Sequence, residues 1–271
     1  MTTREVQQVC LDIMKDVHEF CVKNDIRYSL SGGSMLGAIR HNGFIPWDDD
    51  IDIEIPLPDY DRFIRSYKSE RGYELFSREI DNNNDVYIRW SRICDMNSTY
   101  VEQGPYVWNK KNTGVWIDVL PLYAAPSNKE EFENYMKKFA KYIKYSHWLR
   151  FSKADISQRK YFKGRKKQLS FVIKKILGCF ISNDYIDKCQ RFLRKGSYSE
   201  CKYVCASEHY GLGEWKPKQY VEDVILHTFE DTQFYIMREY DKILRNLYGD
   251  YMQLPPEDKR GGHNKHPYFW K

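Results

Sequence analysis

Residues 32–54 read GGSMLGAIRHNGFIPWDDDIDIE, and this stretch decides the fold. Upstream of it, apolar and polar residues alternate over 26–30, which predicts a strand. The glycines then predict a turn into a short helix over 35–40. Three isoleucines alternate with acidic residues over 50–56, which predicts a second strand with one apolar face. A strand, a Gly-Ser turn, a short helix and an acidic strand are therefore expected to form the core unit.

The acidic half of this stretch holds five carboxylates in the seven positions 48–54. On a strand, alternate side chains share one face at a spacing of about 7 Å, which would align Asp48, Asp50, Asp52 and Glu54. Like charges at that spacing oppose folding unless a cation lies among them. An acidic run is more often a solvated face. The regular isoleucines and the Gly-Ser turn instead favour a site for Mg²⁺ or Mn²⁺, since Mg²⁺ binds carboxylates together with substrate phosphates.

The turn before the short helix has the features of a phosphate site. Gly33 and Ser34 lead into a helix, and a helix N-terminus presents backbone N–H groups to an anion. A phosphate cradle beside a metal-binding strand is what metal-assisted phosphoryl transfer requires. Arg40 is a candidate phosphate clamp because a guanidinium can donate two hydrogen bonds to one phosphate edge. An ordinary surface arginine is the alternative at this position.

Three blocks of sequence resemble those of one family. Residues 32–53 closely resemble the signature of the LicD family of phosphotransferases, and WIDVLPL at 116–122 and LYGDYMQLPPEDKR at 247–260 look like further blocks of it. The resemblance covers most of the chain and is weakest over 127–200. It implies a nucleotidyltransferase-like fold and transfer of phosphocholine from CDP-choline to a sugar hydroxyl. The implied acceptor is a lipid-linked precursor of a cell-surface glycan, teichoic acid-like or lipopolysaccharide, and CMP is released.

The resemblance also implies roles for single residues. In the wider fold superfamily a Gly-Ser turn is followed by an Asp-x-Asp pair and by a third acidic residue on a later strand. The acidic pair corresponds here to Asp50 and Asp52, and the third acidic residue corresponds to Asp118. Asp50 and Asp52 are expected to hold Mg²⁺ and to be catalytic. Asp118 is expected either to complete the metal site or to accept the proton of the attacking hydroxyl.

Further substrate contacts are expected around this centre. Asp48 is expected to be a metal ligand or to orient one. Lys259 and Arg260 belong to the block at 247–260 and are expected to reach substrate phosphates. The nearby His263 and His266 have no such support.

Choline recognition should depend on aromatic residues, because a quaternary ammonium has no N–H group to donate and binds to ring faces. Aromatic residues make up 16% of the chain, enough to supply such a cage. Each single candidate is more often a core or surface residue, so no cage is assigned from Trp90, Trp108, Trp116 and Tyr106. Transfer of another CDP-activated alcohol phosphate, such as ribitol phosphate, would use the same metal and phosphate residues and remains the nearest alternative.

Charge is strongly segregated along the chain. The net charge is +5, but residues 137–175 contain 14 basic residues and one acidic residue, whereas the rest contains 29 basic and 37 acidic residues. An apolar stripe follows over 169–180. A basic amphipathic element suits an anionic membrane surface, and a helical subdomain with a buried stripe is the equal alternative. A nucleic-acid-binding protein is the remote alternative. It leaves the acidic run unexplained, so no nucleic acid is expected.

Predicted strands lie mainly in the first half of the chain and predicted helices mainly in the second, which indicates an α+β fold with a mixed sheet core, flanking helices and a more helical C-terminal half. We expect a catalytic core at 1–126, a basic helical insertion at 127–200 and a C-terminal part at 201–271 that completes the domain. Helices are expected near 2–24, 58–69, 130–148, 169–181 and 234–248.

Cellular location is predicted from two absences. No apolar run of about 18 residues, as a membrane span requires, is present, and the seven cysteines form no CxxC pair. A cytoplasmic protein with peripheral contact at the inner membrane face is expected. Cys201, Cys205 and His209 share a spacing that zinc could use, but a strand over 203–205 and buried thiols are favoured.

Overall fold

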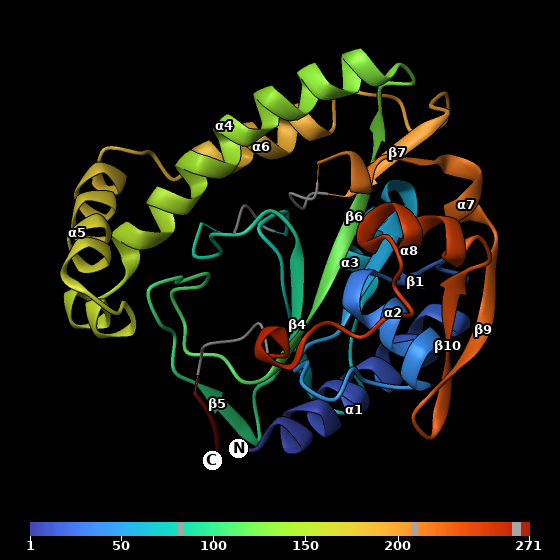
Figure 1. Cartoon of the computed structure of the whole chain (residues 1–271), viewed down its shortest axis with the longest axis horizontal. Helices are drawn as coiled ribbons and strands as arrows, with labels where there is room; N and C mark the ends of the chain where they lie inside the picture. Colours follow the sequence, from blue (N-terminus) through green and yellow to red (C-terminus); the bar gives the residue numbers. More distant parts are fainter. Residues whose placement is uncertain (81–83, 207–210, 262–266) are drawn as a thin grey trace.

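The computed structural model describes residues 1–80, 84–206, 211–261 and 267–271. Its centre is a sheet of seven strands: β1 (Ser29–Leu30), β2 (Asp52–Pro56), β3 (Tyr73–Phe76), β4 (Ser91–Asp95), β6 (Trp116–Ala125), β7 (Tyr203–Ala206) and β8 (Lys216–Pro217). The order is β1-β2-β6-β4-β3, with β7 paired to the far half of β6 and β8 to β7 (Figure 1). β2 and β6 are parallel and the other pairs antiparallel, so the sheet is mixed. With its flanking helices, it confirms the predicted α+β class.

Helices flank the short strands that carry the acidic run. The predicted first helix is confirmed as α1 (Thr3–Lys23), which begins at a capping box of Thr2 and Glu5 and contacts β4 and β6. α2 (Gly32–His41) contacts β1 and β2, and α3 (Leu57–Ser66) contacts β2 and β6. All ten residues of β6 are buried. The acidic run thus enters the sheet beside its most buried strand.

A helical arm extends from the far end of β6 (Figure 1). Its elements are α4 (Lys129–Lys153), the 3₁₀ helix η1 (Ile156–Tyr161), α5 (Arg165–Cys179) and α6 (Tyr185–Leu193). Arg78 ties the arm to the sheet side of the molecule, because its buried guanidinium binds the Asp187 carboxylate of α6 at 2.5 and 2.9 Å. α5 lies at the outer end of the arm, the far left of Figure 1.

The C-terminal part corrects one sequence prediction. The helix predicted over 234–248 is wrong in its first half, because β9 (Val224–Phe229) and β10 (Thr232–Met237) form an antiparallel hairpin and only α8 (Tyr240–Tyr248) is helical. The hairpin turns at Glu230, whose φ is +54°. The remaining elements are β5 (Thr99–Val101) paired with β11 (Tyr268–Trp270), α7 (Lys218–Glu222), and the 3₁₀ helices η2 (Gly211–Glu214) and η3 (Glu257–Lys259).

Two further observations bear on the sequence predictions. No helix in the described part of the chain is both long enough and apolar enough to cross a bilayer. Cys205 is buried on β7, which confirms the predicted strand, while His209 lies outside the described residues.

Candidate active site

The start of α2 lies directly against the acidic run. A side-chain carbon at Gly33 would lie 2.8 Å from Asp48 Oδ2, so only glycine fits there without displacing that carboxylate. Next to it, Ser34 Oγ accepts a hydrogen bond of 2.9 Å from the backbone N–H of Asp52. The predicted phosphate turn therefore has a structural task as well: it fixes the start of β2 to the start of α2.

The carboxylates do not share one face of a strand, as the alternation predicted. β2 begins only at Asp52, so Asp48 and Asp50 lie in the irregular segment before it. The reason is local: Asp48 N–H donates to Ile45 O at 2.9 Å, and Gln7 of α1 binds Asp48 O at 2.7 Å, which holds a turn where strand pairing was expected. Glu54 is on the strand but is buried and paired with Lys216 of β8 at 2.6 and 2.8 Å. It belongs to the core.

The structure nevertheless gathers the predicted catalytic carboxylates. Asp52 of β2 and Asp118 of β6 are direct partners in the parallel register, and Asp118 N–H donates to Ile51 O at 2.9 Å. Burial raises the pKa of Asp50 well above its usual range, and the negative charges of Asp48, Asp49 and Asp118 raise it further. Excess negative charge is thus concentrated at the start of the two parallel strands.

Asp118 is held by residues that the sequence did not indicate. Arg92, its register partner on β4, donates from Nε to Oδ1 at 2.6 Å and from Nη2 to Oδ2 at 3.2 Å. Trp90 Nε1 donates to Oδ1 at 2.5 Å. A carboxylate has about four acceptor positions. Counting partners in the described part of the chain, one position on Oδ2 remains for a metal ion or a hydroxyl.

Two of the aromatic residues that were considered for choline binding, Trp108 and Trp116, enclose Arg92. Its guanidinium carbon lies 4.3 Å from the ring centre of Trp116 and 4.6 Å from that of Trp108, and both rings are buried. A second arginine, Arg150 of α4, is near enough that burial and the charges of Arg92 and Arg89 lower its pKa to about 9. A group of cations thus borders the carboxylates, an arrangement that suits an anionic substrate.

The carboxylates of this site fit a hard divalent cation when substrate phosphates and water supply its other ligands. Among the described residues, no three His, Cys, Asp or Glu side chains are placed to hold one metal ion. Mg²⁺, however, is commonly bound by one or two carboxylates together with substrate phosphates and water. Asp50 and Asp52 meet that requirement chemically, and the metal site stays a prediction.

A cavity of about 460 Å³ adjoins Gly33 and Asp48 and is separate from a cavity of about 470 Å³ beside the arm. The block at 247–260 forms one wall of the cavity at Gly33. Arg40 Nη1 donates to Tyr251 O at 2.7 Å, and the Arg260 guanidinium lies 5.4 Å from the Trp47 ring centre, whereas Lys259 is exposed. The residues that line the cavity at Gly33 are Gly33, Leu36, Arg40, Ile45, Trp47, Asp48, Tyr248, Asp250, Tyr251, Gln253, Leu254, Pro255 and Pro256.

Of the residues predicted to bind substrate, Gly33, Arg40 and Asp48 line this cavity. His263 and His266 lie outside the described residues. The aromatic residues Trp47, Tyr248 and Tyr251 also line the cavity, and a closer reading of the blocks at 32–53 and 247–260 could have indicated them.

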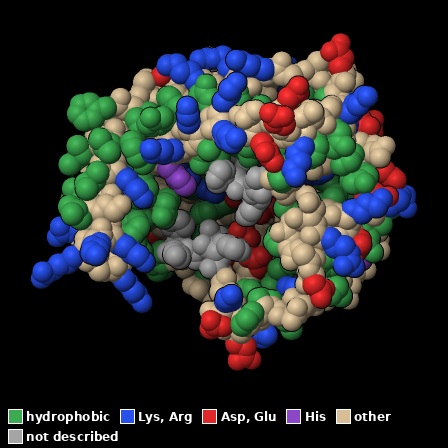
Figure 2. Space-filling view, turned by 45° about the horizontal axis from the view of Figure 1, so that its top comes forward, with side chains coloured by type: hydrophobic (Ala, Val, Ile, Leu, Met, Phe, Trp, Pro, Cys, Tyr) green, Lys and Arg blue, Asp and Glu red, His purple; other side chains and the backbone are tan. Residues whose placement is uncertain are grey.

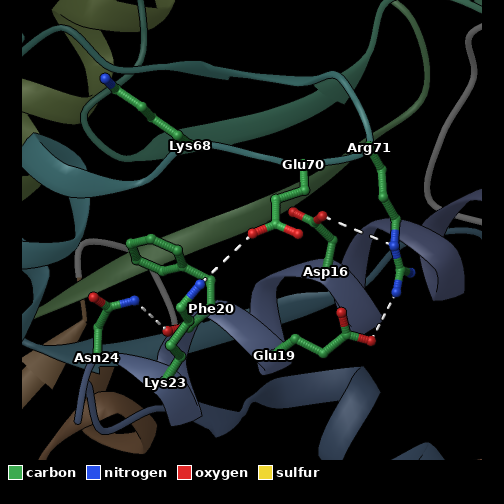
Figure 3. A pocket seen from close by; sticks show the side chains of 8 residues that line it. All are labelled: Asp16, Glu19, Phe20, Lys23, Asn24, Lys68, Glu70 and Arg71. Atoms are coloured by element: carbon green, nitrogen blue, oxygen red, sulfur yellow. Dashed lines mark hydrogen bonds and ion pairs between the residues drawn. The ribbon is translucent and has the colours of Figure 1, made fainter.

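A larger cavity, between the C-terminal part of α1 and the turn before β3, is a poorer candidate (Figure 3). Its walls bind each other: Lys23 pairs with Glu70 at 3.6 Å, and Arg71 pairs with Glu19 at 2.7 Å and with Asp16 at 4.0 Å. Five of the six charged residues that line this cavity thus pair across it and hold its two sides together.

Comparison with known proteins shows which family the chain resembles. Residues 25–171 match the family described as LicD/FKTN/FKRP, nucleotidyltransferase domain. The lipopolysaccharide cholinephosphotransferase LicD of Haemophilus influenzae is 30% identical over 271 residues, covering 97% of this chain and 96% of the relative. The ribitol 5-phosphate transferase FKRP of Mus musculus is 43% identical over 118 residues, which are 42% of this chain and 21% of that protein.

The fold, the site and these matches define a phosphotransferase built on a nucleotidyltransferase domain. The chain belongs to the LicD family.

Proposed function

We propose that the protein transfers phosphocholine from CDP-choline to a sugar hydroxyl of a lipid-linked cell-surface glycan precursor and releases CMP. The cavity beside Gly33 carries the proposal: it joins the start of α2 to a wall that contains Trp47 and Tyr248. The similarity to a lipopolysaccharide cholinephosphotransferase over 97% of the chain supports phosphocholine as the transferred group. The acceptor is a lipopolysaccharide or teichoic acid-like precursor.

The cavity has the chemistry that a choline group needs. A quaternary ammonium gains about 0.5–2 kcal/mol from each aromatic face, and Trp47 and Tyr248 supply such faces. Two acidic residues, Asp48 and Asp250, and one basic residue, Arg40, also line the cavity, so its lining has an excess of negative charge, the sign that attracts choline. A ribitol chain is neutral and rich in hydroxyls, so neither feature would favour it over choline.

The reaction is an in-line displacement at the choline-side phosphorus. The sugar oxygen forms the new P–O bond, the P–O bond to CMP breaks, and the hydroxyl proton passes to a carboxylate, for which Asp118 Oδ2 is the proposed acceptor. Asp50 and Asp52 would hold Mg²⁺, which supplies charge neutralisation at the pyrophosphate. The N–H groups at the start of α2 bind phosphate oxygens, and Arg40 holds the wall of the cavity in place through Tyr251.

The test is release of CMP from CDP-choline and from CDP-ribitol, with Mg²⁺ and a lipid-linked glycan. We expect CDP-choline to be the better donor, and Trp47→Ala to raise its KM roughly tenfold, as loss of about 1.4 kcal/mol predicts. Trp270→Ala, which removes an exposed indole on β11, is the matched control. Faster turnover of CDP-ribitol, the activity named for the FKRP relative, would overturn the choline assignment.

A further inference from the structure

The outer face of α5 is apolar and exposed. The side chains that form it are between 40% and 85% exposed: Leu169, Ile173, Ile176, Leu177 and the C-cap Phe180. The buried residues of α5, Phe171 and Gly178, lie on the opposite side. Gly178 contacts α4 so closely that a side-chain carbon would lie 2.0 Å from Trp148 O. The helix is therefore docked by its other face, and the buried-stripe alternative is wrong.

Two cationic side chains share this side of α5. The segment 137–175 carries 14 basic residues and a single acid, Asp155. Arg165 and Lys166 precede Leu169 by four and three residues, so they lie on the same side of the helix as the apolar face, and both are exposed. Lys167 and Lys174 instead line a cavity of about 630 Å³ together with Phe171, on the docked side. Figure 2 shows hydrophobic side chains gathered at the left of the molecule, where α5 lies, with Lys and Arg side chains next to them.

We propose that α5 is a membrane-docking surface: its apolar face enters an anionic bilayer, and Arg165 and Lys166, on the same side of the helix, bind lipid phosphates. An exposed apolar face on a basic helix has the two features of an interfacial helix. A second copy of this chain is a poor occupant, because it would place two strongly basic segments against each other. The surface lies at the end of the arm, away from the cavity at Gly33 (Figure 1), so docking leaves the choline assignment untouched.

Flotation of the whole protein with vesicles tests this surface. We expect binding to phosphatidylcholine vesicles that contain 30% phosphatidylglycerol and little binding to phosphatidylcholine alone, because basic residues are attracted to the negative surface of an anionic bilayer. I173S/I176S/F180S should weaken binding about tenfold or more, because each apolar side chain contributes to insertion. R165Q/K166Q should weaken vesicle binding in proportion to the fraction of anionic lipid.

Matched variants separate the surface from general effects. V22S/L226S/F269S removes exposed apolar side chains elsewhere, and K23Q/R238Q removes an exposed lysine and an exposed arginine elsewhere. Both should bind like the parent, and the α5 variants should keep the parental Tm and the parental CMP release with a soluble acceptor. Undiminished vesicle binding by I173S/I176S/F180S would overturn the proposal. So would a parental dimer that this variant converts to a monomer, or binding to RNA in preference to vesicles.

Discussion

Arg92 and Asp118 face each other across β4 and β6, joined by two hydrogen bonds of 2.6 and 3.2 Å. The pair is largely buried and is enclosed by the rings of Trp108 and Trp116. Arg92 therefore acts as a positioning residue: it fixes the orientation of the carboxylate that is proposed to accept the hydroxyl proton.

Arg92→Lys should lower kcat by roughly 100-fold, because Lys keeps the charge but not the planar fork that sets the carboxylate geometry. KM for the donor should change little, since Arg92 does not line the cavity that is proposed for the donor. Arg92→Met should in addition lower the free energy of unfolding by about 3–5 kcal/mol, because it leaves a buried carboxylate without its cation. A parental kcat for Arg92→Lys would contradict the positioning role.

Gly33→Ala tests the contact between α2 and the acidic run. The added carbon would lie 2.8 Å from Asp48 Oδ2 and must displace that carboxylate. Overpacking of this kind costs about 1–3 kcal/mol, and a displaced Asp48 should raise KM for the CDP donor. Gly261→Ala is the control, because its added carbon has no neighbour within 4 Å. If both variants show parental kinetics, the phosphate turn has no role in donor binding.

Glu214 should make stability depend on pH. Burial raises its pKa to about 7, and the charge of Glu54 adds to this while that of Lys216 opposes it. Its usual value is 4.5, so between these values the folded protein binds a proton that the unfolded chain has released. The associated stability is present below pH 4.5 and is lost as pH rises to about 7.

Glu214→Gln removes this titration. The variant should gain up to about 3 kcal/mol relative to the parent between pH 5 and pH 8, measured by urea unfolding at each pH. Equal pH profiles for the two proteins would show that Glu214 does not titrate in this range.

Arg78 should control how the arm is attached. It is buried, and besides Asp187 it donates to Asn183 O at 2.7 Å and to Val86 O at 2.9 Å. Arg78→Met leaves these acceptors without a donor and should cost about 3–5 kcal/mol. Hydrogen exchange should accelerate first in α6. Arg238→Met, which breaks an exposed ion pair, should cost less than about 1 kcal/mol.

Local patterns predicted much of this fold, and non-local pairing explains the rest. The capping box at Thr2 and the isoleucines of 50–56 are local signals, and the structure confirms α1 and the buried face of β2. Phe234 and Ile236 fit a strand as well as a helix, and only the turn at Glu230 decides between them.

The same distinction between local signals and non-local pairing applies to the candidate active site. Asp52 and Asp118 could be paired through the resemblance, whereas the pairing of Arg92 with Asp118 depends on strands brought together by the sheet. Periodicity showed that α5 is amphipathic, but not that its apolar face would remain exposed.

The central claim is that Asp50 and Asp52 form the metal-dependent reaction centre. The most direct measurement is CMP release by Asp50→Asn and Asp52→Asn, with Mg²⁺ and after its removal by EDTA. We expect loss of activity in both variants and in the parent with EDTA. The Tm should hold or rise, because each substitution replaces an acidic group in a segment with five carboxylates in seven positions, where like charges oppose folding. Asp231→Asn, at an exposed position, is the control. Full CMP release by either variant at the parental Tm would contradict the account.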